Sequence, residues 1–171
     1  MRRPLPIEHP VAVLAVLLLA LNDHVLKRVC PGFVTGKLSD VAGMVFFPLL
    51  LSSLVSYLLP SYLLPRRGER TLAVACIATA VAFALVKTAP WANDAYRITW
   101  GVMHWPLRVL SAWCAGHATP GPSRALLVRD PGDLIALPFV LAAWRIGRAT
   151  LARRPAMSRP YKDAKKIVPA A

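Results

Sequence analysis

The stretch Val41–Leu59, VAGMVFFPLLLSSLVSYLL, runs for 19 residues without a charged side chain. A helix needs about 20 apolar residues to cross the hydrocarbon core of a bilayer, so this stretch predicts a transmembrane helix. The composition agrees, because 56% of the 171 residues are hydrophobic and the mean hydropathy is +0.49. Soluble proteins contain about 45–50% apolar residues. We therefore expect a membrane protein, long enough for one compact unit.

Three further apolar stretches accompany this one. They are Val11–Leu21, Thr71–Val86 and Leu134–Trp144. Each is short, and each reaches the length of a span only with its flanking residues, whose arginine side chains can extend to the headgroups. We therefore expect an all-α fold, a polytopic membrane bundle of four transmembrane helices within residues 1–150. The expected spans cover about residues 8–26, 39–59, 71–87 and 131–148.

The N-terminal stretch has a second interpretation. Arg2 and Arg3 followed by an apolar core resemble a secretory signal peptide. No small-x-small cleavage site follows cleanly, and the polar triplet Asn22-Asp23-His24 comes directly after the core. A retained first helix is therefore favoured over a cleaved one.

The connection between the third and fourth stretches carries an amphipathic pattern. Arg97, His104 and Arg108 fall on one face of a helix, while Val102 and Trp105 fall on the opposite face. A basic side combined with aromatic rings is typical of a helix that lies in the bilayer interface. We expect such an interfacial helix over about residues 95–116. A fifth span is the alternative, but it would place the basic termini on opposite sides of the membrane.

Basic residues indicate the orientation of the bundle. Most lie before the first stretch, between the second and third, and after the fourth. These are Arg2, Arg3, Arg66, Arg67, Arg70, Arg145, Arg148, Arg153, Arg154, Arg159, Lys162, Lys165 and Lys166. Because such residues accumulate on the cytoplasmic side, we expect a plasma-membrane (inner-membrane) protein with both termini in the cytoplasm. Residues 151–171 are expected to form a basic cytoplasmic tail without fixed structure.

The same topology places a set of polar residues together on the extracytoplasmic side. The set comprises Asn22, Asp23, His24, Lys27, Lys37, Asp40, Lys87, Asp94, Arg129, Asp130 and Asp133. Singly, several have structural explanations: Asp130 can cap a helix, and Asp23 and Lys27 can form a helical ion pair. Together they predict a polar pocket, because ionisable groups in membrane spans are costly and usually functional.

Several classes of site and partner are not expected. No HxxxH or cysteine-rich spacing supports a metal site, and Walker, GxGxxG and EF-hand patterns are absent, so we expect no metal and no cofactor. Cys30 and Cys114 could pair if both faced an oxidising compartment. The net charge of +13 is explained by the topology, so membrane lipids and not nucleic acid are the expected partners.

Two segments resemble the VanZ-like family of membrane proteins. Gly36-Lys37-Leu38-Ser39-Asp40 is similar to the start of that family's second helix, and Arg129–Ala136 is similar to its arginine and aspartate-led final helix. The set as a whole also resembles bacterial multi-pass membrane proteins. The resemblance implies a cell-envelope role, with tolerance of glycopeptide antibiotics as an expected phenotype. The family's acid before the lysine, its histidine and its asparagine are replaced here by Gly36, Asp40 and Leu137.

Two functions remain open at this point. The first is a binding or accessory protein of the cell envelope, whose polar pocket holds a lipid headgroup or a lipid-linked ligand. The second is a membrane hydrolase or transferase that acts on a lipid-linked or lipid phosphate substrate. In that enzyme His24 or an aspartate would be the general base, and Lys37 or Arg129 would stabilise negative charge. The sequence does not indicate an oligomeric state.

Overall fold

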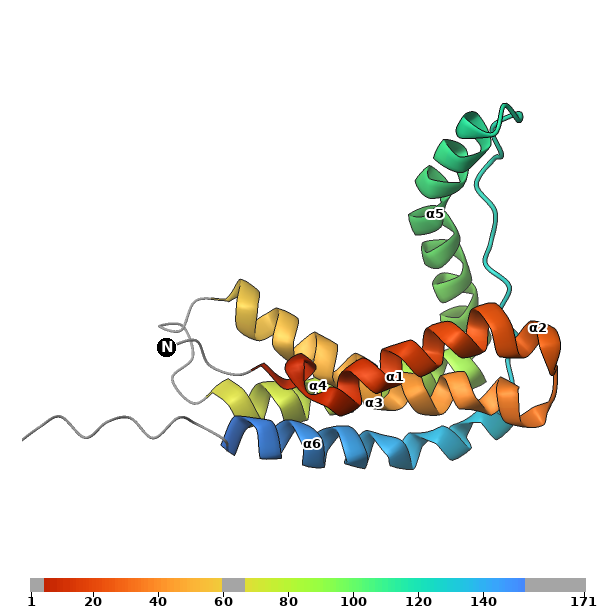
Figure 1. The fold of residues 1–171 in the computed structure, drawn as a ribbon. Helices are drawn as coiled ribbons and strands as arrows, with labels where there is room; N and C mark the ends of the chain where they lie inside the picture. Colours follow the sequence, from red (N-terminus) through yellow and green to blue (C-terminus); the bar gives the residue numbers. More distant parts are fainter. Residues whose placement is uncertain (1–4, 60–66, 153–171) are drawn as a thin grey trace, which may run out of the picture.

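The structure, a computed structural model, describes residues 5–59 and 67–152. Within these residues the chain forms helices joined by short turns and one longer connection (Figure 1). In chain order the elements are η1 (Pro6–Glu8), α1 (Pro10–Leu21), the π-helical turn η2 (Asn22–Leu26), α2 (Lys27–Val29), α3 (Phe33–Leu58), α4 (Arg67–Thr88), α5 (Pro90–Cys114), η4 (Pro131–Phe139) and α6 (Val140–Ala152). Most of the expected basic tail, residues 153–171, lies outside the described residues.

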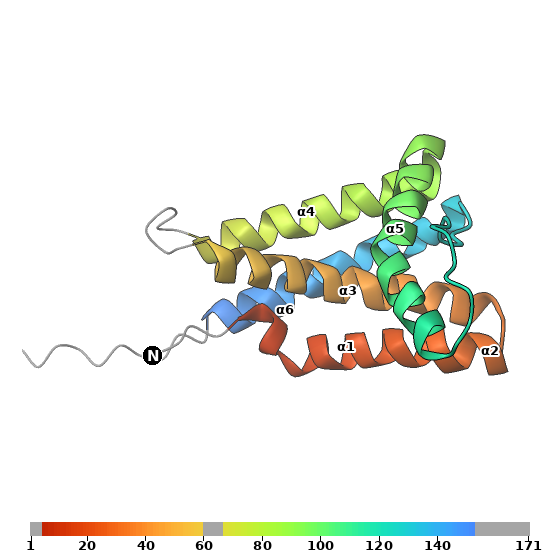
Figure 2. The same cartoon turned by 90° about the horizontal axis from the view of Figure 1, so that it is seen from above.

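Four helical stretches of the described chain are long and apolar enough to cross a membrane. They are Pro10–Val29, Phe33–Leu58, Gly68–Thr88 and Pro131–Ala152. The predicted all-α fold with four such helices is therefore confirmed, and it indicates a multi-pass membrane protein. The four stretches run alongside one another as a bundle (Figures 1 and 2). The element η1, just before the first stretch, contacts α6 at one end of this bundle.

The helix α3 is the central element of the bundle, because it packs against α1, α4 and α6. The core is built largely from small and medium apolar residues. It comprises Ala12, Ala15, Val45, Leu49, Leu72, Cys76 and Ala143. Small side chains let helix backbones approach closely, which is how membrane helices gain van der Waals contact without a hydrophobic driving force. Leu49 and Leu72 are completely buried at the centre of this packing.

The start of α3 determines where its charged residues lie. The helix begins at Phe33, earlier than the span expected from about residue 39. The Gly32 N–H donates to the Thr35 hydroxyl at 3.0 Å, and the Gly36 N–H donates to the Gly32 carbonyl at 3.0 Å. These bonds start the helix one turn before the polar segment. Lys37 therefore lies inside the helix, one turn after its start.

The helix α5 departs from the direction of the bundle. Only Ala89 separates it from α4, yet it projects to the side of the bundle (Figure 1). Pro106 lies inside α5 without dividing it. The connection that follows α5 runs back along it, and the Ala125 N–H donates to the Arg97 carbonyl at 2.9 Å. Gly101 permits this approach, because a Cβ there would collide with the Ser123 carbonyl oxygen.

Packing between α4 and α6 depends on Gly147, and this can be tested with Gly147→Ala. A Cβ at this position would lie 2.5 Å from Leu72 Cδ2, and Leu72 is fully buried, so it cannot move aside. We expect a loss of about 1–3 kcal/mol from overpacking, measured as a lower melting temperature in detergent. Gly36→Ala is the matched control, since no atom lies within 4 Å of its Cβ position. Equal melting temperatures for the two variants would contradict the packing described here.

Candidate functional site

Five charged residues form an ion-pair network, here called the charged network, at one end of the bundle. They are Lys37 and Asp40 of α3, Lys87 of α4, Asp130 just before η4, and Asp133 of η4. Lys37 Nζ lies 2.7 Å from Asp130 Oδ2 and also contacts Asp133 Oδ1. Lys87 Nζ lies 2.5 Å from Asp133 Oδ2 and 3.2 Å from Asp40 Oδ2. The network therefore joins α3, α4 and the fourth span.

Asp133 is the residue that holds the network together. Each of its two carboxylate oxygens accepts a hydrogen bond from a different lysine. Asp133 is only 7% exposed and Lys87 only 6%. Moving such an ion out of water costs several kcal/mol, which the attraction to its partners offsets only while all partners are present. The network is therefore stable as a complete set and costly to leave incomplete.

Local sequence explains how each element presents its charge. Asp130 caps η4, because its carboxylate accepts the Gly132 N–H at 2.8 Å, and Pro131 occupies the first helical position. The Lys37 ammonium and then the Gly132 N–H hold the pKa of Asp130 below its usual value. Asp130 is therefore ionised at neutral pH. Lys87 lies in the last turn of α4, where the helix dipole favours a cation.

A second polar group, formed by Asn22, Asp23, Lys27 and Ser39, joins the first span to α3. Asn22, at the start of the π-helical turn, is fully buried, and its Nδ2 donates to the Thr35 carbonyl at 2.7 Å and to Ser39 Oγ at 2.6 Å. Ser39 Oγ donates in turn to Asp23 Oδ1 at 2.6 Å, which also accepts from Lys27 at 2.7 Å. The expected helical pair between Asp23 and Lys27 is thus confirmed as part of a larger chain of hydrogen bonds.

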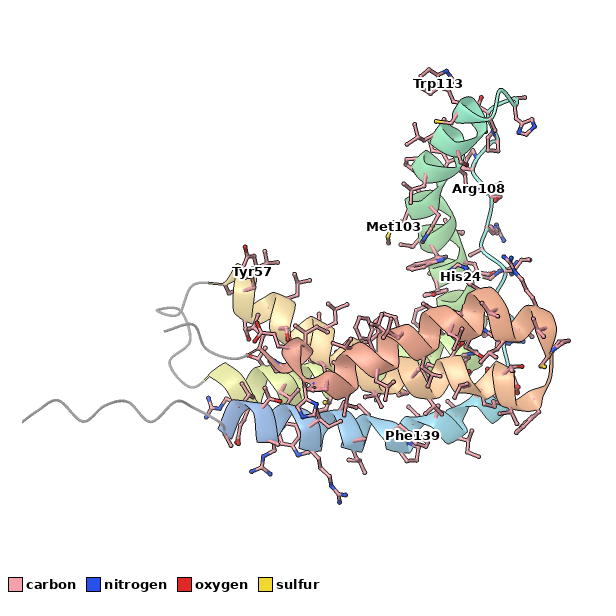
Figure 3. All side chains as sticks on the ribbon, in the orientation of Figure 1. His24, Tyr57, Met103, Arg108, Trp113 and Phe139 are labelled. Carbon is pink, nitrogen blue, oxygen red and sulfur yellow. The ribbon has the colours of Figure 1, made fainter. Side chains whose placement is uncertain are left out.

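The remaining predicted residues lie apart from both groups. Asp94 of α5 is half exposed and pairs with Arg97 at 3.5 Å and, at the limit of an ion pair, with Arg124 at 4.0 Å. His24 and Arg129 are exposed, and neither has a hydrogen bond or ion pair among residues 5–59 and 67–152. In Figure 3 His24 lies on the first span, near the base of α5. The structure therefore does not bring either residue into the charged network.

No group of three or more metal-ligating side chains occurs within the part of the chain that the structure describes. Cys30 and Cys114 are both free and exposed, so the pairing considered from the sequence is not formed. The network contains three carboxylates and two ammonium groups, so both lysines are fully paired and the excess charge is negative. The ammonium groups of Lys37 and Lys87 are therefore paired with aspartates and do not form a ready-made phosphate site.

Sequence reasoning missed two features of this end of the molecule. Ser39 was not among the predicted site residues, although its hydroxyl links Asn22 to Asp23. The folding of the connection onto α5 was also missed. Gly101 gave a signal of this, because a glycine inside a helical pattern costs about 1 kcal/mol relative to alanine and a packing contact can be its reason.

Comparison with known proteins adds no relative. No protein-family model matches the chain, and neither the curated proteins nor the solved structures contain a match. The resemblance to the VanZ-like family is therefore unsupported, and no residue role is carried over from it.

The central place of Asp133 can be tested by comparing Asp133→Asn with Asp130→Asn. The first change leaves the buried Lys87 and the partly buried Lys37 with one carboxylate partner each, for which we expect a loss of about 3–5 kcal/mol. The second should cost much less, because Asp130 is 50% exposed and asparagine also caps helices well. Unfolding of the purified variants in detergent, followed by circular dichroism, measures the difference. An Asp130→Asn variant as unstable as Asp133→Asn would show that the network has no single centre.

Proposed function

We propose that this chain is a binding or accessory membrane protein of the cell envelope, which uses the polar end of its bundle to hold the anionic headgroup of a lipid or lipid-linked ligand. The observation that carries this proposal is the internal pairing of Lys37 and Lys87. Because these lysines are neutralised inside the bundle, the positive charge that remains for a ligand lies on the exposed rim.

The rim is defined by exposed basic residues of the polar end that have no strong acidic partner in the described chain. They are Arg28, Arg124 and Arg129. Arg124 is 61% exposed at the side chain, and its contact with Asp94 is long at 4.0 Å. Guanidinium groups bind phosphate oxygens in a bidentate fashion and add about 1 kcal/mol each near an anionic membrane surface. The rim therefore fits a phosphate-bearing headgroup better than the network does.

We further propose that the polar end faces the extracytoplasmic side. The opposite end of the described chain carries Arg70, Arg145 and Arg148 together with two acids, Glu8 and Glu69, and Glu69 pairs with Arg148 at 3.3 Å. The sequence that adjoins this end adds further basic residues, namely Arg2, Arg3, Arg66, Arg153, Arg154, Arg159, Lys162, Lys165 and Lys166. The positive-inside rule then assigns that end to the cytoplasm. The two ends of the same bundle would thus contact different leaflets.

The enzyme alternative has less support. A general base needs to lie within hydrogen-bond reach of the reacting group and is usually oriented by a neighbour. His24 has neither a hydrogen bond nor an ion pair among the described residues, and Lys37 is held by two aspartates. A carrier is also disfavoured, because the core between the two ends is apolar and closed by Leu49 and Leu72.

The proposed orientation predicts the side from which native Cys30 can be labelled. In a Cys76→Ala/Cys114→Ser variant, we expect a membrane-impermeant maleimide to label Cys30 on intact cells, because Cys30 is exposed at the polar end. In a cysteine-free variant that carries Arg70→Cys, labelling should require permeabilised cells. The opposite pattern would reverse the orientation, and labelling of both sites from one side would contradict the bundle itself.

The proposed ligand class predicts weaker lipid binding in the double variant Arg124→Gln/Arg129→Gln. Loss of two surface arginines should reduce the affinity for phosphatidylglycerol by about fivefold per residue. The measurement is a titration of that lipid into protein held in a neutral detergent. Arg145→Gln, at the other end of the bundle, is the matched control and should change the affinity little. If the control weakens binding as much as the double variant, the rim is not the site, and competition by inorganic phosphate would identify a free anion as the ligand.

A further inference from the structure

The helix α5 carries an apolar stripe that no other described part of the chain covers. The stripe consists of Val102, Met103, Leu107, Leu110 and Trp113, which are between 53% and 73% exposed. Their spacing of three and four residues places Met103, Leu107 and Leu110 along one line of the helix. A contiguous row of large exposed apolar side chains marks a contact with a partner or a membrane, whereas single exposed apolar residues are normal on a protein surface.

The opposite face of α5 is covered by the connection that follows the helix, and Trp105 lies on this face with Arg108, so its predicted place on the apolar face is wrong. The Trp105 indole N–H donates to the Pro120 carbonyl at 2.7 Å, and the Arg108 guanidinium donates to the Ser123 hydroxyl. Arg97 Nε donates to the carbonyl of Ala125 at 3.0 Å. This face is therefore polar and basic, and its hydrogen bonds to the connection leave the charge of Arg108 without an acidic partner among the described residues. The two faces of α5 differ in both chemistry and coverage.

The position of α5 relative to the spans indicates what lies against the stripe. The helix leaves the bundle where the third span ends and projects to the side (Figure 1). Met103 points to the side along which the four spans extend, whereas Arg108 lies on the side of the returning connection (Figure 3). The stripe thus faces the volume that the hydrocarbon would occupy around the bundle, and the arginines face away from it.

We propose that α5 lies in the interfacial layer of the leaflet at the polar end, with its stripe among the acyl chains and its covered face toward water. Interfacial helices bury their apolar face by about 5–10 Å and place basic residues at the level of the phosphates. Arg97 and Arg108 on the covered face, and Arg124 on the connection, supply charge complementary to anionic headgroups. This position of α5 does not depend on the headgroup site proposed above.

Two other occupants fit the observations less well. A fifth span would bury Asp94, Arg97 and Arg108 in hydrocarbon, and α5 does not belong to the stretches that are apolar enough to cross. A second copy of the chain, docked through the same stripe, would cover the apolar side chains but leave the arginines of the opposite face without an anionic partner. A lipid leaflet provides acyl chains for the stripe and anionic headgroups for the arginines.

The test places a fluorescent label on either face of α5 in the full-length protein, reconstituted into liposomes of phosphatidylcholine and phosphatidylglycerol. In a cysteine-free background, Met103→Cys and Leu110→Cys report on the stripe. Gly121→Cys reports on the connection, where nothing lies within 4 Å of an added Cβ. An unchanged melting temperature shows that each variant is folded. Quenching is then compared between aqueous iodide and lipids that carry a nitroxide at a shallow or a deep position of the acyl chain.

We expect the labels at positions 103 and 110 to be quenched by the shallow nitroxide and protected from iodide, and the label at position 121 to show the reverse ratio. Equal iodide quenching at positions 103 and 121 would overturn the proposal, because the stripe would then face water. Strongest quenching by the deep nitroxide would indicate a fifth span. Protection from both quenchers, together with disulfide-linked dimers of Met103→Cys, would indicate that a second copy covers the stripe.

Discussion

One carboxylate that serves two ammonium groups inside an apolar bundle is the interaction on which this structure depends. Asp133 reaches Lys37 of α3 with one oxygen and Lys87 of α4 with the other. In water such pairs contribute little to stability, whereas in a low-dielectric interior a charge that lacks its partner strongly destabilises the fold. The register of the fourth span against α3 and α4 is thereby set by charge, in a molecule whose other helix contacts are mostly non-directional.

The two halves of the bundle consequently hold together by different means. Toward the end where η1 meets α3, small residues and the completely buried Leu49 and Leu72 provide contact area. Toward the polar end, hydrogen bonds and ion pairs replace that packing, and the π-helical turn inserts the buried Asn22 between the first span and α3. This division explains why Lys37 and Lys87, which the sequence assigns to a polar pocket, are paired with aspartates within the fold instead.

The sequence predicts the coarse architecture well because hydropathy reports directly on the solvent around each helix. Val41–Leu59 and the three shorter stretches predicted four membrane-crossing helices, and the amphipathic pattern after them predicted a further helix. Which lysine pairs with which aspartate was not predictable from the sequence. Asp130 and Asp133 are both close to lysines in the structure, but only tertiary distances reveal that the second joins two of them. The exposure of single residues was not predictable from the sequence either. His24 follows Asp23 and the buried Asn22, which both belong to the hydrogen-bonded group, and yet it makes no hydrogen bond or ion pair in the described chain.

The bond between Lys87 and Asp133 has a further meaning in terms of chain entropy. It joins residues 46 positions apart, and everything between them is α5 and its returning connection. The bond therefore closes a long loop of the chain, as a disulfide between the same two positions would. Because the entropy of closing a loop grows only with the logarithm of its length, doubling the loop would cost about 0.6 kcal/mol. The segment between Lys87 and Asp133 can thus change in length and sequence while the four-helix bundle keeps its geometry.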